Sequence, residues 1–220
     1  MILPKVVIHN SMSLDGSLTG FEVNMALHYA LAARYKPGAH LIGSNTLMGG
    51  IESSGKEVPP EEKDDFSKPE KDPSLPYWVI PDTSGKLYGM LHTFRRFDYC
   101  RDVILVVSDN TPREYLRYLE ERSYDYHSVG KEHADLKKSL ALLEEKYKVQ
   151  SVLVDAGRIL SSLLLGQGLV DEISLLVHPV IVGKKSHSMF SDIVEKMTLT
   201  LDRSERLDEH YTWLVYRIEE

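Results

Sequence analysis

The sequence has little cysteine, no excess of positive charge and no long apolar run. Cys100 is its one cysteine, so neither an intramolecular disulfide nor a cysteine metal cluster can form. A lone thiol favours a reducing compartment, and we expect the cytoplasm. A basic segment followed by an apolar core, typical of secretory signals, is also missing, and no apolar stretch is long enough to span a bilayer. We therefore expect a cytoplasmic protein with no membrane partner.

Charge and short motifs exclude further classes. Lys and Arg total 26 against 33 Asp and Glu, a formal charge of -7, whereas a protein that binds nucleic acid needs a basic surface. No pair of histidines has the spacing typical of a zinc site, and no Gly-x-Ser-x-Gly hydrolase motif occurs. Apolar residues make up 42% and charged residues 27% of the chain, which is typical of a globular protein. We therefore expect no nucleic-acid partner and no metal.

Strand and helix patterns alternate along the chain. Short β-branched runs predict strands, and apolar residues at helical spacing predict helices. Thr111 to Glu114 has the pattern of a capping box, with Pro112 as the first helical residue. The predicted strands are 5–13, 39–43, 77–81, 103–107, 124–127, 151–154 and 171–177, and the predicted helices are 22–36, a helix from 44, 112–122, 136–147 and 158–165. With two alternating runs at 197–218 that form a hairpin, this order predicts an α/β fold with a mostly parallel sheet.

Residues 49–76 differ in composition from the rest of the chain. They are rich in Glu, Lys, Asp and Pro and contain few apolar residues. This composition predicts an exposed, mobile insert in an otherwise single domain that spans 1–220. We therefore expect that deletion of residues 57–72 leaves the melting temperature unchanged.

Two predicted strands lead into helices through polar, glycine-containing segments. Asp155-Ala156-Gly157-Arg158 follows the strand at 151–154, and Gly43-Ser44-Asn45-Thr46 follows the strand at 39–43. The N-terminus of a helix binds anions, and glycine allows a phosphate to approach the backbone closely. Two such sites at one edge of a sheet suit a dinucleotide or a phosphorylated substrate. The alternative is two ordinary helix starts, in which Gly157 is needed only for a positive φ.

Further candidate residues have two interpretations each. Asp15 follows the first strand and could face a ligand, although Asp15-Gly16 is also common turn chemistry. His9, His28 and His178 are too scattered in sequence for a metal site, so we interpret them as core or surface residues.

Taken in order, these motifs resemble the riboflavin-biosynthesis reductases. The resemblance covers nearly the whole chain outside 49–76, and it rests on Ser13-Leu14-Asp15-Gly16, Gly43 to Thr46, Val152 to Gly157, Gly168-Leu169-Val170-Asp171-Glu172-Ile173 and His178-Pro179-Val180-Ile181-Val182-Gly183. It implies a dihydrofolate-reductase-like fold, NADPH as cofactor, a phosphorylated ribosylaminopyrimidine as substrate and a homodimer. By resemblance, Asp15 and Asp155 are catalytic, Asp15, Asp82 and Asp155 bind the substrate, and Gly43, Thr46, Ser108, Ala156, Gly157, Arg158 and Ile159 bind the cofactor.

The chain departs from the family pattern in two places. Asp155-Ala156-Gly157 stands where the family usually has Glu-Gly-Gly, and Gly183-Lys184 stands where it has Gly-Gly. These departures leave open a reductase of another small carbonyl or imine, or a nucleotide-binding relative without activity. Dihydrofolate reductase itself is disfavoured, because it needs an acid in the helix that ends near Pro37, and none occurs between Val23 and Pro37.

The acidic chain needs a locally basic cleft to bind two anionic ligands. Arg158, Lys184 and Lys185 are candidates, although the two lysines also suit a solvated loop. Ser108 and Thr111 could donate hydrogen bonds to the 2′-phosphate of NADPH, with Asp109 as a repulsive neighbour. We expect NADPH rather than NADH on the resemblance.

Overall fold

The computed structural model describes residues 2–219, which form two compact units. The terminal unit combines Lys5–Pro37 with the chain from Ser151 onward, and the central unit contains Gly38–Gln150. Helices and strands lie within three residues of the predicted bounds wherever the sequence predicts one. Over residues 2–219, no helix is both long and apolar enough to cross a membrane.

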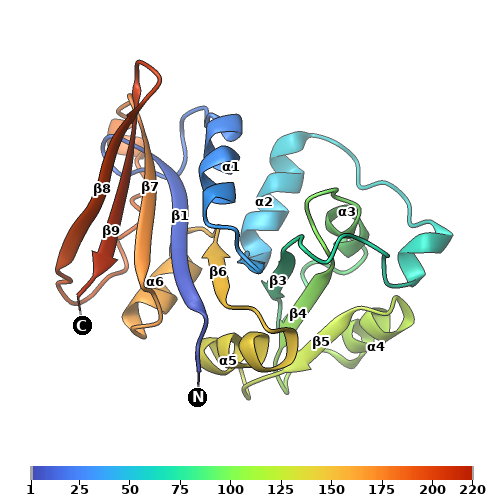
Figure 1. Cartoon of the computed structure of the whole chain (residues 1–220). Coiled ribbons are helices and arrows are strands. Elements are labelled where there is room, and N and C mark those ends of the chain that lie inside the picture. The colour runs from blue at the N-terminus through green and yellow to red at the C-terminus, as the bar shows by residue number, and fades with distance from the viewer. Residues whose placement is uncertain (1, 220) are drawn as a thin grey trace. The chain divides into compact units, whose positions relative to one another are not determined.

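The terminal unit contains five strands in the order β6-β1-β7-β9-β8. β1 pairs in parallel with both β6 and β7, and β7, β9 and β8 then pair antiparallel. In Figure 1, β1, β7, β9 and β8 lie side by side. The C-terminal hairpin is therefore confirmed, and its bounds and those of the other strands are β1 Lys5–Ser13, β6 Ser151–Val154, β7 Glu172–His178, β8 Leu199–Leu207 and β9 Tyr211–Ile218.

Helices α1 (Met25–Arg34) and α6 (Arg158–Gly166) complete the terminal unit, with a 3₁₀ turn at Gly183–Lys185. α1 begins three residues later than predicted, because the Asn24 side chain accepts a hydrogen bond from the amide of Leu27 and caps the helix there. The buried face of α1 contains His28, Leu31 and Ala32. The apolar core of this unit includes Leu31, Leu176, Leu207, Trp213 and Val215, with Val7, Ala32 and Leu153 in a second cluster.

The central unit contains four parallel strands in the order β5-β4-β3-β2. Every residue of β4 is buried, as its unbroken apolar run predicts. The strands are β2 Ala39–Leu41, β3 Tyr77–Pro81, β4 Val103–Val107 and β5 Asp125–Ser128, and the helices are α2 Ser44–Ser54, α3 Leu91–Arg95, α4 Arg113–Glu121 and α5 Leu136–Tyr147, with a 3₁₀ turn at Lys63–Phe66. Both units thus have the predicted α/β architecture.

Two local features of the central unit differ from the sequence analysis. The capping box predicted at Thr111 is absent, because the Thr111 hydroxyl accepts a hydrogen bond from the Ser108 amide at 3.0 Å and leaves Pro112 as a helix cap without a side-chain bond. Helix α3 was not predicted, because it is only five residues long and its cap residue, Met90, makes no side-chain hydrogen bond. Helices this short depend on tertiary packing rather than on sequence propensity.

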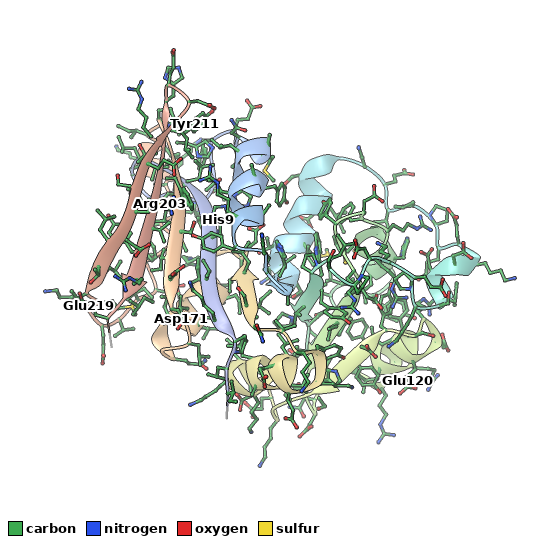
Figure 2. The ribbon with its side chains drawn as sticks, viewed as in Figure 1. His9, Glu120, Asp171, Arg203, Tyr211 and Glu219 are labelled. Carbon is green, nitrogen blue, oxygen red and sulfur yellow. The ribbon has the colours of Figure 1, made fainter. Side chains whose placement is uncertain are left out.

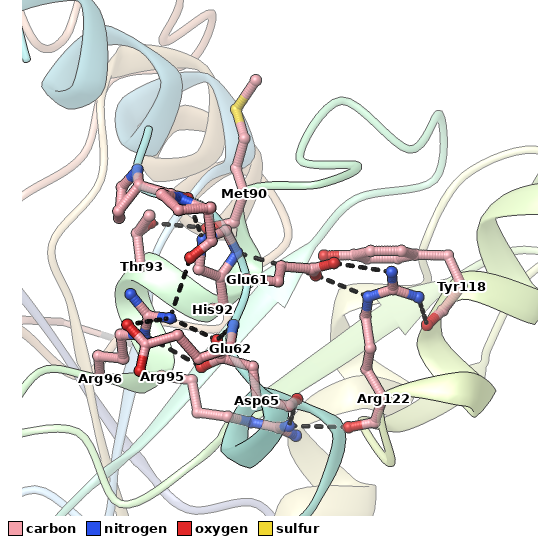
Figure 3. Close-up of polar contacts among 12 residues, drawn as sticks. Glu61, Glu62, Asp65, Met90, His92, Thr93, Arg95, Arg96, Tyr118 and Arg122 are labelled. Carbon is pink, nitrogen blue, oxygen red and sulfur yellow. Dashed lines mark hydrogen bonds and ion pairs between the residues drawn. The ribbon is translucent and has the colours of Figure 1, made fainter. Parts of the chain in front are cut away.

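The segment 49–76 is exposed over most of its length, but polar bonds attach it to the rest of the central unit. Its first residues continue α2. Glu61 accepts two hydrogen bonds from Arg122 at 2.6 and 2.7 Å, and Asp65, which is 5% exposed, pairs with Arg96 (Figure 3). Lys71 donates to three backbone carbonyls. The segment is therefore not the loosely attached excursion that its composition suggests.

A buried arginine, Arg95, explains why the composition of the segment 49–76 does not predict these bonds. Arg95 is 3% exposed, pairs with Asp102 at 2.8 Å and donates to the carbonyls of Asp65 and Ser67. A buried guanidinium needs such partners, because an unpaired buried charge is very costly. The segment 49–76 thus packs against the unit through hydrogen-bond acceptors for this arginine, and not through apolar side chains.

Candidate active site

The predicted site residues lie in both units. Asp15 and the residues from Asp155 to Ile159 belong to the terminal unit, whereas Gly43, Thr46, Asp82 and Ser108 belong to the central unit. We describe each group within its own unit.

The N-terminus of α6 is the first candidate site. β6 ends at Val154, Gly157 is the helix cap and α6 begins at Arg158. Gly157 has a φ of −70°, so the alternative that this glycine serves a positive φ is wrong. Ala156 is 1% exposed, and its carbonyl accepts a hydrogen bond from Asn10 Nδ2 at 3.1 Å. The backbone here is thus held firmly, with no cap side chain at the helix end.

The first turn of α6 contains Arg158 and Ile159, both predicted to contact the cofactor. Ile159 is 57% exposed, so a ligand at the helix start can reach its side chain. Arg158 forms an ion pair with Asp192 and a hydrogen bond with Ser191 at 3.3 Å. This pair is largely exposed, so solvent screens it and a stronger anion could compete for the guanidinium.

Asp155 lies between the end of β6 and this helix. Its side chain is 26% exposed, and its Oδ2 atom is 3.4 Å from Nε2 of His28 on α1. The other ring nitrogen of His28 is 3.0 Å from the hydroxyl of Ser11 on β1. The His28 ring therefore links β1 to the residue that follows β6.

Asp15 lies just beyond the end of β1. Its carboxylate accepts hydrogen bonds from the Ser13 hydroxyl at 2.6 Å and from the amides of Val182 and Gly183 at 3.1 and 2.8 Å. These bonds, the Ser13 bond foremost, lower the pKa of Asp15 to about 2. Asp15 is therefore ionised at neutral pH, when it can accept hydrogen bonds or balance a positive charge but has no proton to give.

The departure at Gly183-Lys184 has a local explanation. Gly183 has a φ of +74°, which glycine adopts without strain, whereas Lys184 does not have a positive φ. The backbone therefore requires glycine only at the first of the two positions. Both lysines of the loop, Lys184 and Lys185, lie in the 3₁₀ turn and are exposed.

In the central unit, Gly43 caps α2 as Gly157 caps α6. Gly43 has a φ of −69°, and its carbonyl accepts a hydrogen bond from the amide of Thr46 at 2.9 Å. The Asn45 side chain accepts from Lys86 Nζ at 2.5 Å. The helix start is again a glycine without a cap side chain, which is suited to anion binding.

Asp82 has a structural role within the central unit. It is 1% exposed, and its carboxylate accepts from the amides of Lys86 and Leu87 and from the hydroxyl of Tyr115, each at 3.0 Å. Burial, and next the Asp82 charge, raise the pKa of Tyr115, so this phenol remains a donor. These bonds hold the turn after β3 in place. A contact between Asp82 and a substrate stays a prediction.

Ser108 and its neighbours also have partners in the central unit. Ser108 is 1% exposed and donates its hydroxyl proton to the carbonyl of Glu132 at 3.1 Å. The Asp109 carboxylate accepts from the Ser128 hydroxyl at 2.8 Å. A 2′-phosphate would have to replace the Glu132 bond to reach the Ser108 hydroxyl.

The sequence analysis missed the histidines as possible functional residues. His9, His28 and His178 are 0%, 4% and 3% exposed, so all three are core residues. His28 nevertheless contacts the predicted catalytic acid. The sequence does contain a signal that His28 is buried, because it lies three residues before Leu31 and so shares the apolar face of the same helix. No group of three potential metal ligands occurs among residues 2–219.

Comparison with known proteins identifies the fold and the family of the chain. A parallel sheet flanked by helices, with an antiparallel C-terminal hairpin, is the dihydrofolate-reductase-like α/β fold of the reductases that it matches. The profile of the RibD C-terminal domain family matches residues 4–213. The chain therefore belongs to that family, and the resemblance seen in the sequence is confirmed.

Three solved structures illustrate the likeness. RibD of Acinetobacter baumannii has a TM-score of 0.70 at 21% identity, over 99% of this chain and 58% of that chain. A pyrimidine reductase-like protein of Corynebacterium diphtheriae has a TM-score of 0.71 at 17% identity, over 99% and 92%. The yeast riboflavin biosynthesis reductase Rib7 has a TM-score of 0.68 at 18% identity, over 100% and 91%.

Two of the similar proteins are described as reductases and a third as a pyrimidine reductase-like protein. The chain spans only 58% of Acinetobacter RibD. The similar protein of Thermotoga maritima is described as both a deaminase and a reductase, and the chain spans 57% of it. No curated protein matches the sequence.

Proposed function

We propose that the chain is an NADPH-dependent reductase of riboflavin biosynthesis. In this proposal it reduces the ribosyl side chain of a ribosylaminopyrimidine 5′-phosphate to a ribityl chain. Family membership over residues 4–213 is the observation that carries the proposal. The printed descriptions of Rib7 and of the Thermotoga protein, which name reductases of this pathway, support it.

The α6 N-terminus fits the phosphates of a nicotinamide cofactor. Gly157 caps the helix at a φ that any residue can adopt, so the backbone does not require glycine at this position. The lack of a side chain instead suits a ligand that approaches the backbone closely. Arg158 adds a positive charge in the first turn. We assign the cofactor's phosphates to Thr46, Gly157 and Arg158, and further cofactor contacts to Gly43, Ser108, Ala156 and Ile159. When bound, NADPH supplies the hydride.

The reduction needs one hydride and one proton. The ribose ring opens to an imine, the hydride adds to its first carbon, and the imine nitrogen takes a proton. Asp155 is the better candidate to bind a substrate hydroxyl or share in this proton transfer, because its carboxylate is partly exposed beside a histidine. Asp15, with a pKa of about 2, is suited to orient the substrate or the loop at Gly183. Asp82 is retained as a substrate contact on resemblance alone.

A second candidate is a reductase of another small carbonyl or imine. Asp155-Ala156-Gly157 favours this alternative, because a shorter acid changes the reach of the group that faces the substrate. A nucleotide-binding relative without turnover is the further alternative. Dihydrofolate reductase is disfavoured, because α1 contains no acid.

We also propose a cytoplasmic homodimer that binds the phosphorylated pyrimidine. The family resemblance supports the dimer, and the lone cysteine supports the compartment. Light scattering during size-exclusion chromatography tests the dimer, which a monomeric mass at micromolar concentration would contradict.

NADPH oxidation by the purified protein tests the proposed activity. The assay compares the ribosylaminopyrimidine phosphate with dihydrofolate and with simple carbonyls, and repeats each with NADH. The proposal expects turnover of the pyrimidine and a preference for NADPH. Turnover of another carbonyl alone favours the second candidate, and tight NADPH binding without any turnover favours the inactive relative. Restoration of riboflavin synthesis in a cell that lacks the reductase is the genetic counterpart.

A further inference from the structure

His28 is a buried histidine that the proposed chemistry does not yet use. It lies on the buried face of α1, and its side chain is 5% exposed. Both ring nitrogens nevertheless have polar partners, Ser11 on one side and Asp155 on the other. A histidine that only filled the core would need no carboxylate.

The partners determine where the ring carries its proton. A carboxylate oxygen can only accept, so the neutral ring of His28 carries its proton on Nε2, toward Asp155. Nδ1 then accepts a hydrogen bond from the Ser11 hydroxyl at 3.0 Å. Hydrogen bonds therefore run in one direction, from Ser11 through His28 to Asp155.

A second histidine fixes the position of the first. The His9 ring, on β1 in Figure 2, lies 4.5 Å from the His28 ring between centroids, and its Nε2 atom donates to the backbone carbonyl of His28 at 3.1 Å. The other nitrogen of His9 is 2.9 Å from the Ser174 hydroxyl, which also accepts from the Trp213 indole at 2.9 Å. Buried polar groups that are all bonded in this way form a rigid network. The network holds helix α1 at the point where His28 reaches Asp155.

We propose that His28 is a positioning residue, which orients the Asp155 carboxylate for the reduction. This inference rests on the proposed function, since it gives Asp155 a role in turnover. A hydrogen bond from a fixed donor restrains the orientation of the side chain that accepts it. The 3.4 Å distance is long for such a bond, and contacts of this kind often tighten only when a ligand binds.

Several polar groups face His28. They are Ser11 and His9 on β1, Tyr29 on α1 itself, Asp155 after β6 and His178 at the end of β7. Burial chiefly lowers the pKa of His178. Asp155 is the one carboxylate among these groups, so it is the acceptor that the His28 ring can orient.

Two substitutions separate the two sides of the His28 ring. His28→Gln places an amide nitrogen where Nε2 lies and retains a donor to Asp155. His28→Asn reaches only as far as Nδ1, so it retains a partner for Ser11 and loses the Asp155 contact. Both are neutral and polar, which makes them matched variants for folding. Melting temperature and circular dichroism measure any loss of structure in each.

We expect kcat of His28→Asn to fall about 10- to 100-fold, the usual effect of losing one hydrogen bond to a charged group. The dissociation constant of NADPH should stay unchanged. His28→Gln should recover most of the turnover. Equal losses in the two variants would overturn the inference.

A double variant and a spectroscopic measurement complete the test. If His28 acts through Asp155, His28→Asn combined with Asp155→Asn should be no slower than Asp155→Asn alone, whereas additive losses contradict the inference. Nitrogen-15 NMR of the histidine rings needs no turnover. It should show a proton on Nε2 of His28, and the Nε2 signal should move in Asp155→Asn because the acceptor of that proton has changed. An unchanged Nε2 signal would refute the coupling even if the protein proves to be a reductase, and inactivity of the wild type would refute only the proposed function.

Discussion

Asp82 and Asp155 occupy equivalent positions in the two units, since each directly follows the last residue of a parallel strand. Their surroundings differ. Asp82 is 1% exposed and holds two amides and a phenol, whereas the Asp155 side chain is 26% exposed and lies beside a histidine. The comparison shows that an acid after a strand is not by itself a functional signal. An acid saturated by its own turn is structural, and one that remains partly exposed beside a titratable group is suited to chemistry.

The largest expected effect is on turnover at Asp155. Asp155→Asn keeps the size and removes the charge, so kcat should fall about 10²-fold or more, as is usual when a group that shares in proton transfer is lost. The affinity for NADPH should change little. Asp155→Glu restores the acid that the family usually has and should keep activity or shift substrate choice. If Asp155 only caps the helix, the Asn variant keeps parental turnover, which would remove Asp155 from the catalytic residues.

The next effect concerns residues 57–72. Deletion removes the partners of Arg96 and Arg122 and two acceptors of the buried Arg95. Breaking a buried pair costs about 3–5 kcal/mol, and each kcal/mol shifts the melting temperature of a chain this long by about 2–4 °C. We therefore expect a loss of about 6–20 °C, not the unchanged melting that composition predicts.

The deletion also joins two ends of the chain, which can change stability by itself. A matched pair of point variants avoids this effect. Asp65→Asn weakens the pair with Arg96, and Asp64→Asn changes an exposed neighbour in the same 3₁₀ turn. Only the first should lower the melting temperature. Equal melting of both variants and the parent would show that the ion pairs of this segment do not stabilise the unit.

Asp82→Asn should affect stability more than turnover. The amide nitrogen of asparagine cannot accept the hydrogen bond that a carboxylate oxygen accepted, and the donor left without a partner costs about 1–3 kcal/mol. Thermal denaturation should show a decrease of about 2–12 °C. The kcat per folded molecule should fall much less than in Asp155→Asn, since Asp82 is proposed only as a substrate contact, and a kcat loss as large as that of Asp155→Asn would break the contrast between the two acids.

Asp15 predicts a pH dependence of stability. Its pKa is about 2 in the folded chain against 3.8 ordinarily, so its contribution is present above about pH 4 to 5 and is lost as pH falls toward 2. Asp15→Asn should therefore have a shallower loss of melting temperature over that range than the parent. If the melting temperatures of Asp15→Asn and the parent fell in parallel as the pH is lowered, the bonds to Ser13 and Gly183 would not stabilise the charged form of Asp15.

Gly157→Ala gives the smallest expected change in stability. Alanine adopts a φ of −70° without strain, so the free energy of unfolding should stay within about 0.5 kcal/mol of that of the parent. If the glycine serves a close phosphate, the dissociation constant of NADPH should rise. Unchanged affinity in a calorimetric titration would argue against phosphate binding at this helix.

Sequence patterns predicted the architecture because it depends on apolar residues. The fully buried β4 and the apolar face of α1 are visible as a run and as a period. The attachment of residues 57–72 could not be predicted in this way, because it depends on Arg95 and Arg122 finding carboxylates and carbonyls across distant segments. His28 was missed for the same reason, since its contact with Asp155 spans 127 positions.

Transfer of a labelled hydride tests the central claim most directly. The purified protein would be given NADPH that carries deuterium on the reactive face of the nicotinamide, together with the ribosylaminopyrimidine 5′-phosphate. The account predicts deuterium at the first carbon of a ribityl product, found by mass spectrometry and NMR. NADPH that stays intact, or deuterium that appears only in another carbonyl compound, would contradict it.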